Sequence, residues 1–348
     1  MGGFIDNEWV GGPLEYMLPH AHAAVYESLD RVELVACCDP RTDVLARFGE
    51  RYGVPPEKRY TDYREMLTRE ELDIVSIATQ PEQRAEIALF ACERGVRALF
   101  CEKAFAASLE EADRVAQAVK ARNIAFAMGT SRRWDVGYEQ MKALIHSGEL
   151  GELKSIVIYG TGTLYNSASH WFDLALWLNN DAPVAWVQAN LPGGDGAIDG
   201  EVLRRDPVGE GLFRFADGVT VYALQTPRGP EIEAICSKGT VAALNNARDW
   251  LVRRMAGETW RALEPAPFPD YVRQSPNRRL VEELIAALDT GAPTRGGVDV
   301  AVANQELIAA FIESHRRGGA RVELPLPPAQ RRVRLESGVG GRQPKYVS

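Results

Sequence analysis

The chain has 348 residues, of which 45% are hydrophobic and 25% charged, as in ordinary globular proteins that are long enough for two domains. Its formal net charge of -8 argues against nucleic acid as a partner, because such proteins neutralise phosphates with a basic surface. No apolar run reaches the roughly 18 residues of a membrane span. The chain opens without the pattern of a secretory signal, and we expect a cytoplasmic protein without membrane contact.

Short apolar runs alternate with helical patterns between residues 32 and 128. The runs predict buried strands at 32–38, 72–78, 96–101 and 124–128, and the helical patterns lie at 42–52, 82–94 and 109–122. Gly53 and Gly95 fit helix C-terminal ends, and Ser108 fits an N-cap. This alternation predicts an α/β domain with a doubly wound parallel sheet over residues 1–129.

The pattern changes at about residue 150 to longer extended runs joined by glycine-containing turns. Strands are predicted at 153–161, 184–191, 211–215, 219–225 and 231–237, and helices at 271–288 and 298–315. We expect an α+β domain over residues 130–326, with a large, mostly antiparallel sheet backed on one face by the helices. Residues 327–348 are rich in Pro, Gly and Arg, and are interpreted as a flexible tail or an arm reaching a partner subunit.

Ligands of open parallel sheets bind beyond the carboxyl ends of the strands, so the residues that follow each strand are the first site candidates. Asp39 follows the strand at 32–38, where a carboxylate accepts hydrogen bonds from an adenosine ribose and favours NAD. Arg41 could instead clamp a 2'-phosphate, so NAD and NADP both remain open. Thr79 and Gln80 follow the next strand and are further candidates for contacting the cofactor.

Two other side chains have the chemistry of alcohol oxidation. Lys103 follows Glu102 at the end of the strand at 96–101, where its ammonium could hydrogen-bond a substrate hydroxyl; a surface lysine is the alternative interpretation. His170 opens an apolar helical run, and an imidazole is a natural general base, although it could also be a packed core histidine. The histidines at 20 and 22 have neither the spacing nor the partners of a metal site, and no metal is predicted.

These features occur together and in a characteristic order. The order comprises Ile74–Thr79, an Ala-rich helix ending at Gly95, Cys101–Ala104, Arg132–Trp134, Gly148–Leu153 and His170–Asp173, preceded by Pro19–Ala23 and Tyr26. Over roughly residues 20–325 the chain resembles the glucose-fructose oxidoreductase and inositol dehydrogenase (Gfo/Idh/MocA) family.

The resemblance implies a Rossmann-like first domain and an NAD(P)-dependent enzyme that interconverts an alcohol and a carbonyl on a sugar, inositol or related polyol. It implies that Lys103, from a Glu-Lys-Pro motif, orients the substrate oxygen, and that His170 is the acid/base. Glu102 and Lys103 would also contact the cofactor. Substrate-pocket candidates are Arg132, Trp134, Tyr165, Asn166 and Asp173. A homo-dimer or homo-tetramer through the second-domain sheet is the implied assembly.

Three departures from the family pattern bear on activity. Ala104 replaces the motif proline, and Asn166 replaces an aspartate that precedes the histidine, with Tyr165 and Asp173 as nearby substitutes. The third departure is at the N-terminus, where the family's first strand and its glycine-rich phosphate loop are incomplete. The residues in the position of that loop, and so the cofactor candidates there, are Gly2, Gly3, Phe4 and Ile5.

We weigh two interpretations of this N-terminus. In the first, the written start falls inside the glycine motif, the central strand lies upstream, and residues 6–18 form an insertion. In the second, the strand is absent and residues 6–18 are remodelled. The first is favoured because a missing central strand exposes its neighbours' edges. Two functional alternatives also stay open: a non-catalytic member that senses a nucleotide or sugar, and a lyase or glycosidase that uses transient NAD oxidation.

Overall fold

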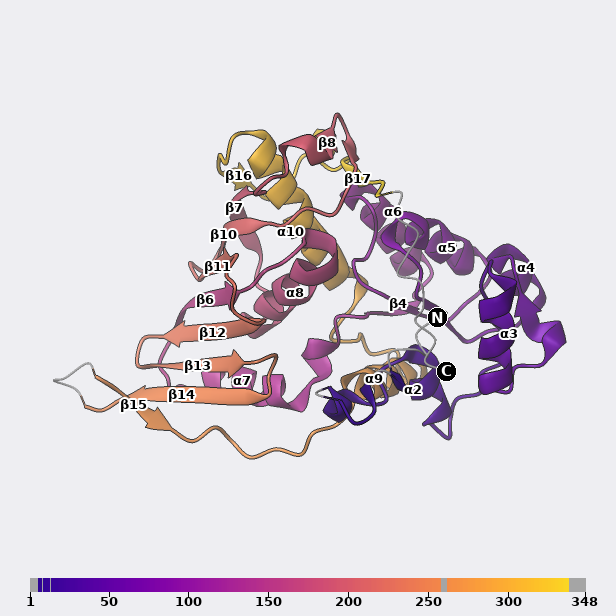
Figure 1. Ribbon diagram of the computed structural model, residues 1–348, viewed down its shortest axis with the longest axis horizontal. Helices are drawn as coiled ribbons and strands as arrows, with labels where there is room; N and C mark the ends of the chain where they lie inside the picture. The colour runs from indigo at the N-terminus through magenta and orange to yellow at the C-terminus, as the bar shows by residue number, and fades with distance from the viewer. Residues whose placement is uncertain (1–5, 8, 13, 258–261, 338–348) are drawn as a thin grey trace.

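The computed structural model describes residues 6–7, 9–12, 14–257 and 262–337, and its two domains lie side by side (Figure 1). The cofactor candidates Gly2, Gly3, Phe4 and Ile5 lie outside the described residues. In the first domain every strand pair is parallel, as expected, but the strands form two separate sheets. One sheet pairs β1 (Cys37–Cys38) with β2 (Arg59–Tyr60), and the other is β3 (Ile74–Ile77), β4 (Ala98–Cys101) and β5 (Ala125–Met128).

The central strand of the three-stranded sheet explains why this region is so apolar. All four residues of β4 are fully buried. Ala98 and Phe100 pack into a cluster with residues of α2 and α9, whereas Leu99 and Cys101 pack with residues of α5 and α6. Alternate side chains of a strand point to opposite faces, so helices on both faces bury the whole strand.

The helices of the first domain are α2 (His22–Glu27), α3 (Thr42–Arg51), α4 (Tyr63–Arg69), α5 (Pro81–Glu93) and α6 (Leu109–Ala121), with short 3-10 turns η1 (Glu15–Met17) and η2 (Pro56–Lys58). Helices α3, α5 and α6 begin and end close to the predicted positions, whereas α4 lies in no predicted range. The Ser108 hydroxyl accepts a hydrogen bond from the Glu111 N–H at 3.2 Å, which confirms the predicted N-cap. Gly53 and Gly95 have φ of 67° and 77°, a conformation that glycine adopts without strain.

The strand predicted at 32–38 is paired only over its last two residues, in β1. Residues 32–36 are in no strand and line a cavity of about 1360 Å³ between β1 and β3. A strand needs a neighbour to be paired, and within the described residues β1 has β2 on one edge and nothing on the other. The apolar pattern therefore predicted a strand longer than the part that pairs with a neighbouring strand among the described residues.

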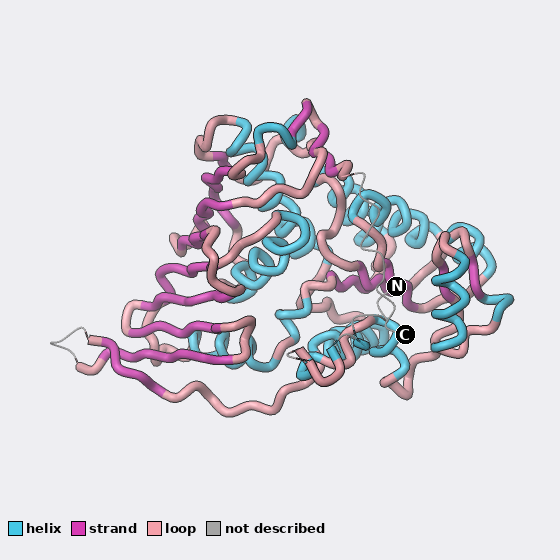
Figure 2. Tube along the Cα trace, viewed as in Figure 1, coloured by secondary structure: helices cyan, strands magenta, loops and turns pink. Residues whose placement is uncertain are grey.

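The second domain contains a large sheet, whose strands are magenta in Figure 2. Its nine strands lie in the order β15-β14-β13-β12-β6-β11-β10-β7-β16. Its strands are β6 (Leu153–Tyr159), β7 (Val184–Asn190), β10 (Glu210–Phe215), β11 (Thr220–Leu224), β12 (Glu231–Cys236), β13 (Gly239–Leu244), β14 (Asp249–Met255), β15 (Leu263–Ala266) and β16 (Val322–Glu323). Only β6 and β11 pair in parallel, so the prediction of a mostly antiparallel sheet is confirmed.

The helices of the second domain lie between the large sheet and the first domain. They are α7 (Val136–His146), α8 (Ser169–Leu178) and α10 (Val298–Arg316), with the 3-10 turns η3 (Ser131–Trp134) and η5 (Asp195–Ala197) and the π-helical turn η4 (Leu164–Ala168). Helix α10 contacts β7, α8 and also α6 of the first domain (Figure 1).

Helix α9 (Pro276–Thr290) lies elsewhere than expected. It was predicted to back the large sheet together with α10, but it packs against α2, β4 and β5 of the first domain. Its apolar residues Leu280, Val281 and Leu284 fill the face of the parallel sheet that α2, with only six residues, leaves open. The amphipathic pattern indicated a covered sheet face, but not which sheet.

The prediction of a flexible tail or arm is wrong for residues 327–337. This segment forms η6 (Pro328–Gln330) and β17 (Arg334–Leu335), which extends a small sheet of β9 (Val202–Leu203) and β8 (Ile198–Asp199). Arg331 forms ion pairs with Asp113 of α6 at 2.7 Å and with Glu306 of α10 at 3.0 Å. The segment therefore ties the two domains together. No helix among the described residues is long and apolar enough to cross a membrane.

Candidate active site

The carboxyl ends of β3, β4 and β5 bring three loops to one edge of the parallel sheet. Glu102 directly follows β4, and its N–H donates to the Ile77 carbonyl of β3 at 3.0 Å. Gly129 follows β5, and a Cβ at that position would lie 3.1 Å from the Glu102 carboxyl group. Glycine is therefore needed for the end of β5 to approach the carboxylate.

Glu102 is held as a carboxylate by its neighbours. Its Oε1 lies 3.1 Å from His22 Nε2, and the His22 ring stacks on Phe100 with 3.7 Å between ring centroids. Burial raises the pKa of Glu102, but the hydrogen bond and charge of His22, together with the charges of Lys103 and Arg84, outweigh burial and lower the pKa to about 2. Glu102 is thus negatively charged at neutral pH.

Lys103 projects across the domain boundary. Its ammonium donates to the Asn166 carbonyl oxygen at 2.7 Å and to Asn166 Oδ1 at 3.0 Å. The Asp206 carboxylate accepts the Asn166 N–H at 2.9 Å and so fixes this turn. Burial lowers the pKa of Lys103, and the charges of Arg84 and Arg132 add to that effect, while Glu102 opposes it. The ammonium is therefore held by neutral oxygen atoms and is free to exchange them for a hydroxyl.

His170 is the second residue of α8, on the same side of the domain boundary as Asn166. Its Nδ1 is buried and has no hydrogen-bond partner in the described part of the chain. Burial lowers the pKa of His170 well below its ordinary value, and the charges of Lys103, Arg132 and His20 lower it further. A neutral imidazole near a lysine can accept a proton from an alcohol.

Two residues of this cluster were not predicted as site residues. His20 is half-buried beside Trp9, with 4.6 Å between the ring centroids, and desolvation lowers the pKa of His20 to about 4. His22 holds Glu102, as described above. In the sequence, the two-residue spacing of His20 and His22 pointed only to the question of a metal site. In the structure, a bend between His20 and α2 lets both rings approach the site.

The structure divides the substrate-pocket candidates into two groups. Arg132 lies in the cluster: its guanidinium is 4.3 Å from the Trp171 ring centroid, and its charge influences the pKa of both Lys103 and His170. Asn166 contacts Lys103. The other three candidates, Trp134, Tyr165 and Asp173, are buried in the core with relative exposures of 0%, 3% and 0%.

Each of these three buried residues is engaged by protein partners. Trp134 Nε1 donates to Glu283 at 3.0 Å, and the Tyr165 hydroxyl donates to the Ala107 carbonyl at 2.9 Å. Asp173 Oδ1 accepts from Arg133 Nε at 2.8 Å. Their aromatic or acidic character suggested that they form pocket walls. The helical register of η3, η4 and α8 instead directs their side chains into the core. We assign them structural roles.

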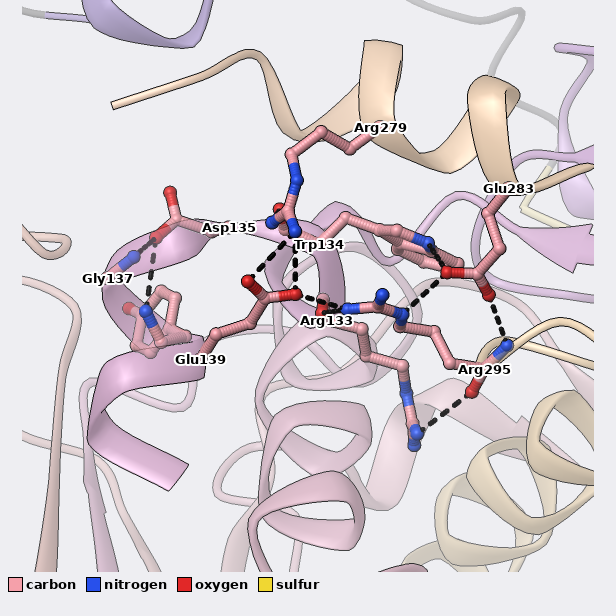
Figure 3. A network of polar contacts seen from close by, with 9 residues as sticks. Arg133, Trp134, Asp135, Gly137, Glu139, Arg279, Glu283 and Arg295 are labelled. Atoms are coloured by element: carbon pink, nitrogen blue, oxygen red, sulfur yellow. Dashed lines mark hydrogen bonds and ion pairs between the residues drawn. The ribbon is translucent and has the colours of Figure 1, made fainter. Parts of the chain in front are cut away.

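A charged network beneath the site fixes the entry to the second domain (Figure 3). Glu139 of α7 binds Arg279 of α9 at 2.9 Å and also binds Arg295. Glu283 of α9 binds Arg295 Nε at 2.6 Å and accepts from Trp134. The network joins α7, α9 and the loop before α10, so it sets the position of η3, on which Arg132 lies.

The large cavity between β1 and β3 extends to the carboxyl edge, where Asp39, Arg41, Thr79 and Gln80 line it. Asp39 Oδ1 accepts from Arg41 N–H at 3.0 Å, so both candidates for binding the ribose end lie together. Thr79 Oγ1 and His22 Nδ1 are buried, line the same cavity and have no hydrogen-bond partner among the described residues. Unpartnered polar atoms on a cavity wall fit the ribose and nicotinamide ends of a dinucleotide.

The segment before α2 binds its own backbone amides with an acidic side chain. The Asp6 carboxylate accepts the N–H groups of His20 at 3.0 Å and Ala21 at 2.8 Å, just before α2. In a dinucleotide-binding fold the first helix and its glycine loop face the pyrophosphate. Here an acidic side chain of the protein holds these amide groups, and the described residues before α2 include no G-x-G-x-x-G sequence.

Residues 14–130 match the model of an oxidoreductase family with an NAD-binding Rossmann fold, the Gfo/Idh/MocA family. The first domain therefore has the NAD-binding Rossmann fold of this family. Over 253 residues it is 25% identical to myo-inositol 2-dehydrogenase from Thermotoga maritima, a match that covers 66% of this chain and 73% of that enzyme. Inositol 2-dehydrogenase from Salmonella typhimurium is 28% identical over 162 residues, 43% of this chain and only about half, 48%, of that enzyme.

The fold is shared along nearly the whole chain with solved structures. Levoglucosan dehydrogenase in complex with NADH and levoglucosan superposes with a TM-score of 0.69 at 20% identity, and covers 91% of this chain and 98% of its own. The prediction of a Rossmann-like domain followed by a large sheet domain is thus confirmed. The prediction of an NAD(P)-dependent dehydrogenase is confirmed by the family model of the first domain and by the likeness to inositol 2-dehydrogenases.

Proposed function

We propose that the protein interconverts an alcohol and a carbonyl group on a sugar, inositol or related polyol, with His170 as acid/base and Lys103 as the residue that orients the substrate oxygen. The observation that carries this proposal is the approach of the two residues across the domain boundary: the Lys103 ammonium binds the Asn166 carbonyl at 2.7 Å, four residues before His170, and burial together with this charge lowers the pKa of His170. The relatives named above act on myo-inositol and bind levoglucosan, and this supports a cyclic polyhydroxylated substrate.

The proposed roles follow from the state of each group. Lys103 exchanges its bonds to Asn166 for a hydrogen bond to the substrate hydroxyl and stabilises negative charge on that oxygen as it becomes a carbonyl oxygen. His170 takes the hydroxyl proton, since its lowered pKa leaves it neutral before reaction. A bound nicotinamide supplies the hydride exchange at the same carbon. Asp39, Thr79 and Glu102 are the residues that would contact the dinucleotide.

The function is tested by titrating the full chain with NADH and NADPH by fluorescence, and then following reduced nicotinamide absorbance with inositols, aldoses and sugar ketones. We expect micromolar cofactor binding and turnover of at least one cyclic polyol. Cofactor binding without turnover of any polyol or sugar would favour the second candidate, a non-catalytic member that senses a nucleotide. Failure to bind either cofactor, which the Asp6 carboxylate on the His20 and Ala21 amides would explain, would favour the other form of this candidate, a non-catalytic member that senses a sugar.

Replacing Lys103 with methionine is expected to lower kcat by about 10²-fold, because the neutral side chain cannot stabilise charge on the substrate oxygen. NADH affinity should change little, since the ammonium contacts Asn166 rather than the ribose-end residues. Steady-state kinetics and NADH fluorescence separate the two effects. Lys154→Met, at a lysine exposed on the second domain, is the matched control. Equal activity of the Lys103 variant and this control would contradict the assigned role.

Replacing Asp39 with serine is expected to shift cofactor preference toward NADPH by about tenfold or more. A carboxylate that accepts ribose hydroxyls contributes about 1.5–3 kcal/mol and repels a 2'-phosphate, while the neighbouring Arg41 would then attract that phosphate. The ratio of the dissociation constants for NADH and NADPH measures the shift. Asp43→Ser, in the exposed first turn of α3, should leave this ratio unchanged.

We further propose that the outer face of the nine-stranded sheet forms the homo-oligomer contact. Tyr222 and Leu251 lie in one row of paired residues that crosses neighbouring strands, so their side chains are on the same face of the sheet. Each side chain is 40% exposed, and Leu224, two residues beyond Tyr222, is 38% exposed. Tyr222→Glu is expected to shift a dimer or tetramer to monomer in light scattering after gel filtration. Val272→Glu, at a residue 78% exposed away from the sheet, is the control. A wild-type monomer would contradict this proposal.

A further inference from the structure

A turn of the second domain holds two arginine side chains beside the candidate active site. The turn joins β13 to β14, and its Asn246 Oδ1 accepts from Arg132 Nη2 at 2.8 Å. The carbonyl of the next residue, Ala247, accepts from Arg273 Nη2 at 3.0 Å. Asn246 and Ala247 have φ of 58° and 65°, a conformation that residues other than glycine keep only where surrounding contacts impose it. The fold therefore places two guanidinium groups on adjacent residues of one constrained turn.

Tyr16 of η1 brings the first domain onto the same turn. Its hydroxyl donates to the Asn246 carbonyl at 2.9 Å, and the Arg273 guanidinium lies 4.2 Å from the centroid of its ring. Arg132 is held in the same way, 4.3 Å from the ring centroid of Trp171 in α8. A cation–π contact fixes the position of a guanidinium without neutralising its charge. Both arginines are therefore positioned by aromatic rings and keep their positive charge.

These two arginines differ from their neighbours in having no carboxylate partner. Arg133, which follows Arg132 in the chain, binds Asp173 at 2.8 Å. Arg132 and Arg273 form no ion pair with another described residue, and the atoms that accept their hydrogen bonds are neutral oxygens. Arg132 is half-buried and Arg273 is exposed, so a ligand can reach both. Because a guanidinium binds the paired oxygens of a carboxylate with two parallel hydrogen bonds, the two side chains are suited to hold an anion.

The local charge balance fits a single negative charge. Asp135 faces both arginines; burial raises its pKa, and two N–H groups of α7 and the two arginine charges oppose that rise. Two guanidinium charges against this one carboxylate leave a net positive charge. The Tyr138 hydroxyl is buried near Arg132 and has no hydrogen-bond partner among the described residues, so it is a further donor. A carboxylate carries one negative charge, whereas a phosphate monoester carries about two.

We propose that Arg132 and Arg273 bind a carboxylate group of the substrate, so that the substrate is a sugar acid rather than a neutral sugar or inositol. This carboxylate subsite rests on the proposed function, since the reacting carbon of the same molecule lies at Lys103 and His170. The two places are close, because Trp171, which contacts Arg132 with its ring, directly follows His170. The carboxylate fixes the sugar ring at a second point, and one hydroxyl group is thereby oriented toward the imidazole.

The probes are glucuronate and galacturonate, each compared with its neutral amide, which keeps the sugar ring and removes the negative charge. Calorimetric titration of the full chain, with and without NADH, is expected to show that at least one acid binds about tenfold or more tightly than its amide, because the amide cannot form the charge-assisted bonds. Where the chain turns the sugar over, kcat/KM should favour the acid in the same way. Glucose 6-phosphate tests the other anion and should bind more weakly than the preferred acid.

Three variants complete the test. Arg273→Met is expected to lower the preference for the acid over its amide about tenfold, because one of the two cations is lost, and Arg273→Lys should keep part of the preference. Arg278→Met, at an exposed arginine of α9 that binds Glu282, should leave the preference unchanged.

The wild-type chain decides the matter even if a variant does not fold. If neither acid binds more tightly than its amide, the carboxylate subsite is overturned, although turnover of neutral polyols would still support the proposed function. A preference that Arg273→Met leaves unchanged would also overturn it, as would tighter binding of glucose 6-phosphate than of either acid. A preference for the acid in calorimetry without turnover of any sugar supports the subsite and counts against the proposed function alone.

Discussion

Replacing His170 with alanine is expected to reduce kcat by about 10²- to 10⁴-fold, because the variant has no group to take the proton from the substrate hydroxyl. NADH affinity should be nearly unchanged, since the cofactor candidates lie on the other domain. The measurement is kcat and KM for the best polyol, alongside NADH fluorescence. His146→Ala is the matched control. Among the described residues, the His146 imidazole forms a hydrogen bond with the Leu178 carbonyl, at 2.8 Å, and none with a site residue.

The pH profile adds a second test of His170. Activity requires neutral His170 and charged Lys103. Burial and nearby positive charge lower the pKa of His170 well below 6.5, so activity should be lost on acidification only below the ordinary histidine range. Burial also lowers the pKa of Lys103 from 10.5, so the alkaline loss should begin below that value. An acidic limb near pH 6.5 that remains in the His170 variant would contradict the assignment.

Replacing Arg133 with methionine is expected to lower the free energy of unfolding by about 3–5 kcal/mol. The Arg133 side chain is 0% exposed and bridges Asp173, also 0% exposed, at 2.8 Å and Asp181 at 2.7 Å. Without the guanidinium, Asp173 would be a buried carboxylate with no opposite charge. Urea unfolding monitored by tryptophan fluorescence measures the change.

The control for Arg133 is Arg317→Met. The Arg317 side chain is 43% exposed, and its ion pair with Glu313 contributes about 1 kcal/mol or less to the free energy of unfolding. A buried carboxylate without a partner has a raised pKa in the folded state, so the Arg133 variant should become less destabilised as the pH falls from 8 to 5. The double variant with Asp173→Leu should recover part of the loss. Equal stability losses in Arg133→Met and Arg317→Met would contradict this account.

Sequence patterns predicted the local elements well because each depends on residues close in the chain. The buried run at 96–101, the Ser108 cap and the glycine after α5 all appear within a few residues of their predicted positions. The position of α9 could not be predicted, because an amphipathic helix indicates a buried face without indicating which sheet covers it. The strand predicted at 32–38 is paired over only two residues, because among the described residues β1 has no second neighbouring strand. A local sequence pattern does not show which strands will be neighbours.

The site divides in the same way. Lys103 and His170 were predicted from motifs, and the structure places both at one domain boundary. His20, His22 and Asp206 were missed because their roles arise from tertiary contacts: a ring stacked on Phe100, and a carboxylate under the Asn166 turn. Trp134, Tyr165 and Asp173 were chosen by residue type, which does not reveal the direction of a side chain on a short helix.

The division of the parallel sheet also has a consequence for local unfolding. Residues 37–69, with β1, β2, α3 and α4, have a small core of their own around Cys37, Leu45 and Val54. The apolar residues of this unit that belong to the main core are Tyr63, Met66 and Leu67 of α4. The part with β1, β2 and α3 should therefore open at a lower free energy than global unfolding. Asp39 belongs to this unit. A ligand that binds Asp39 in the closed state would therefore stabilise that state against local opening. Slower cleavage by a protease within residues 37–69 would then report that the ligand is bound.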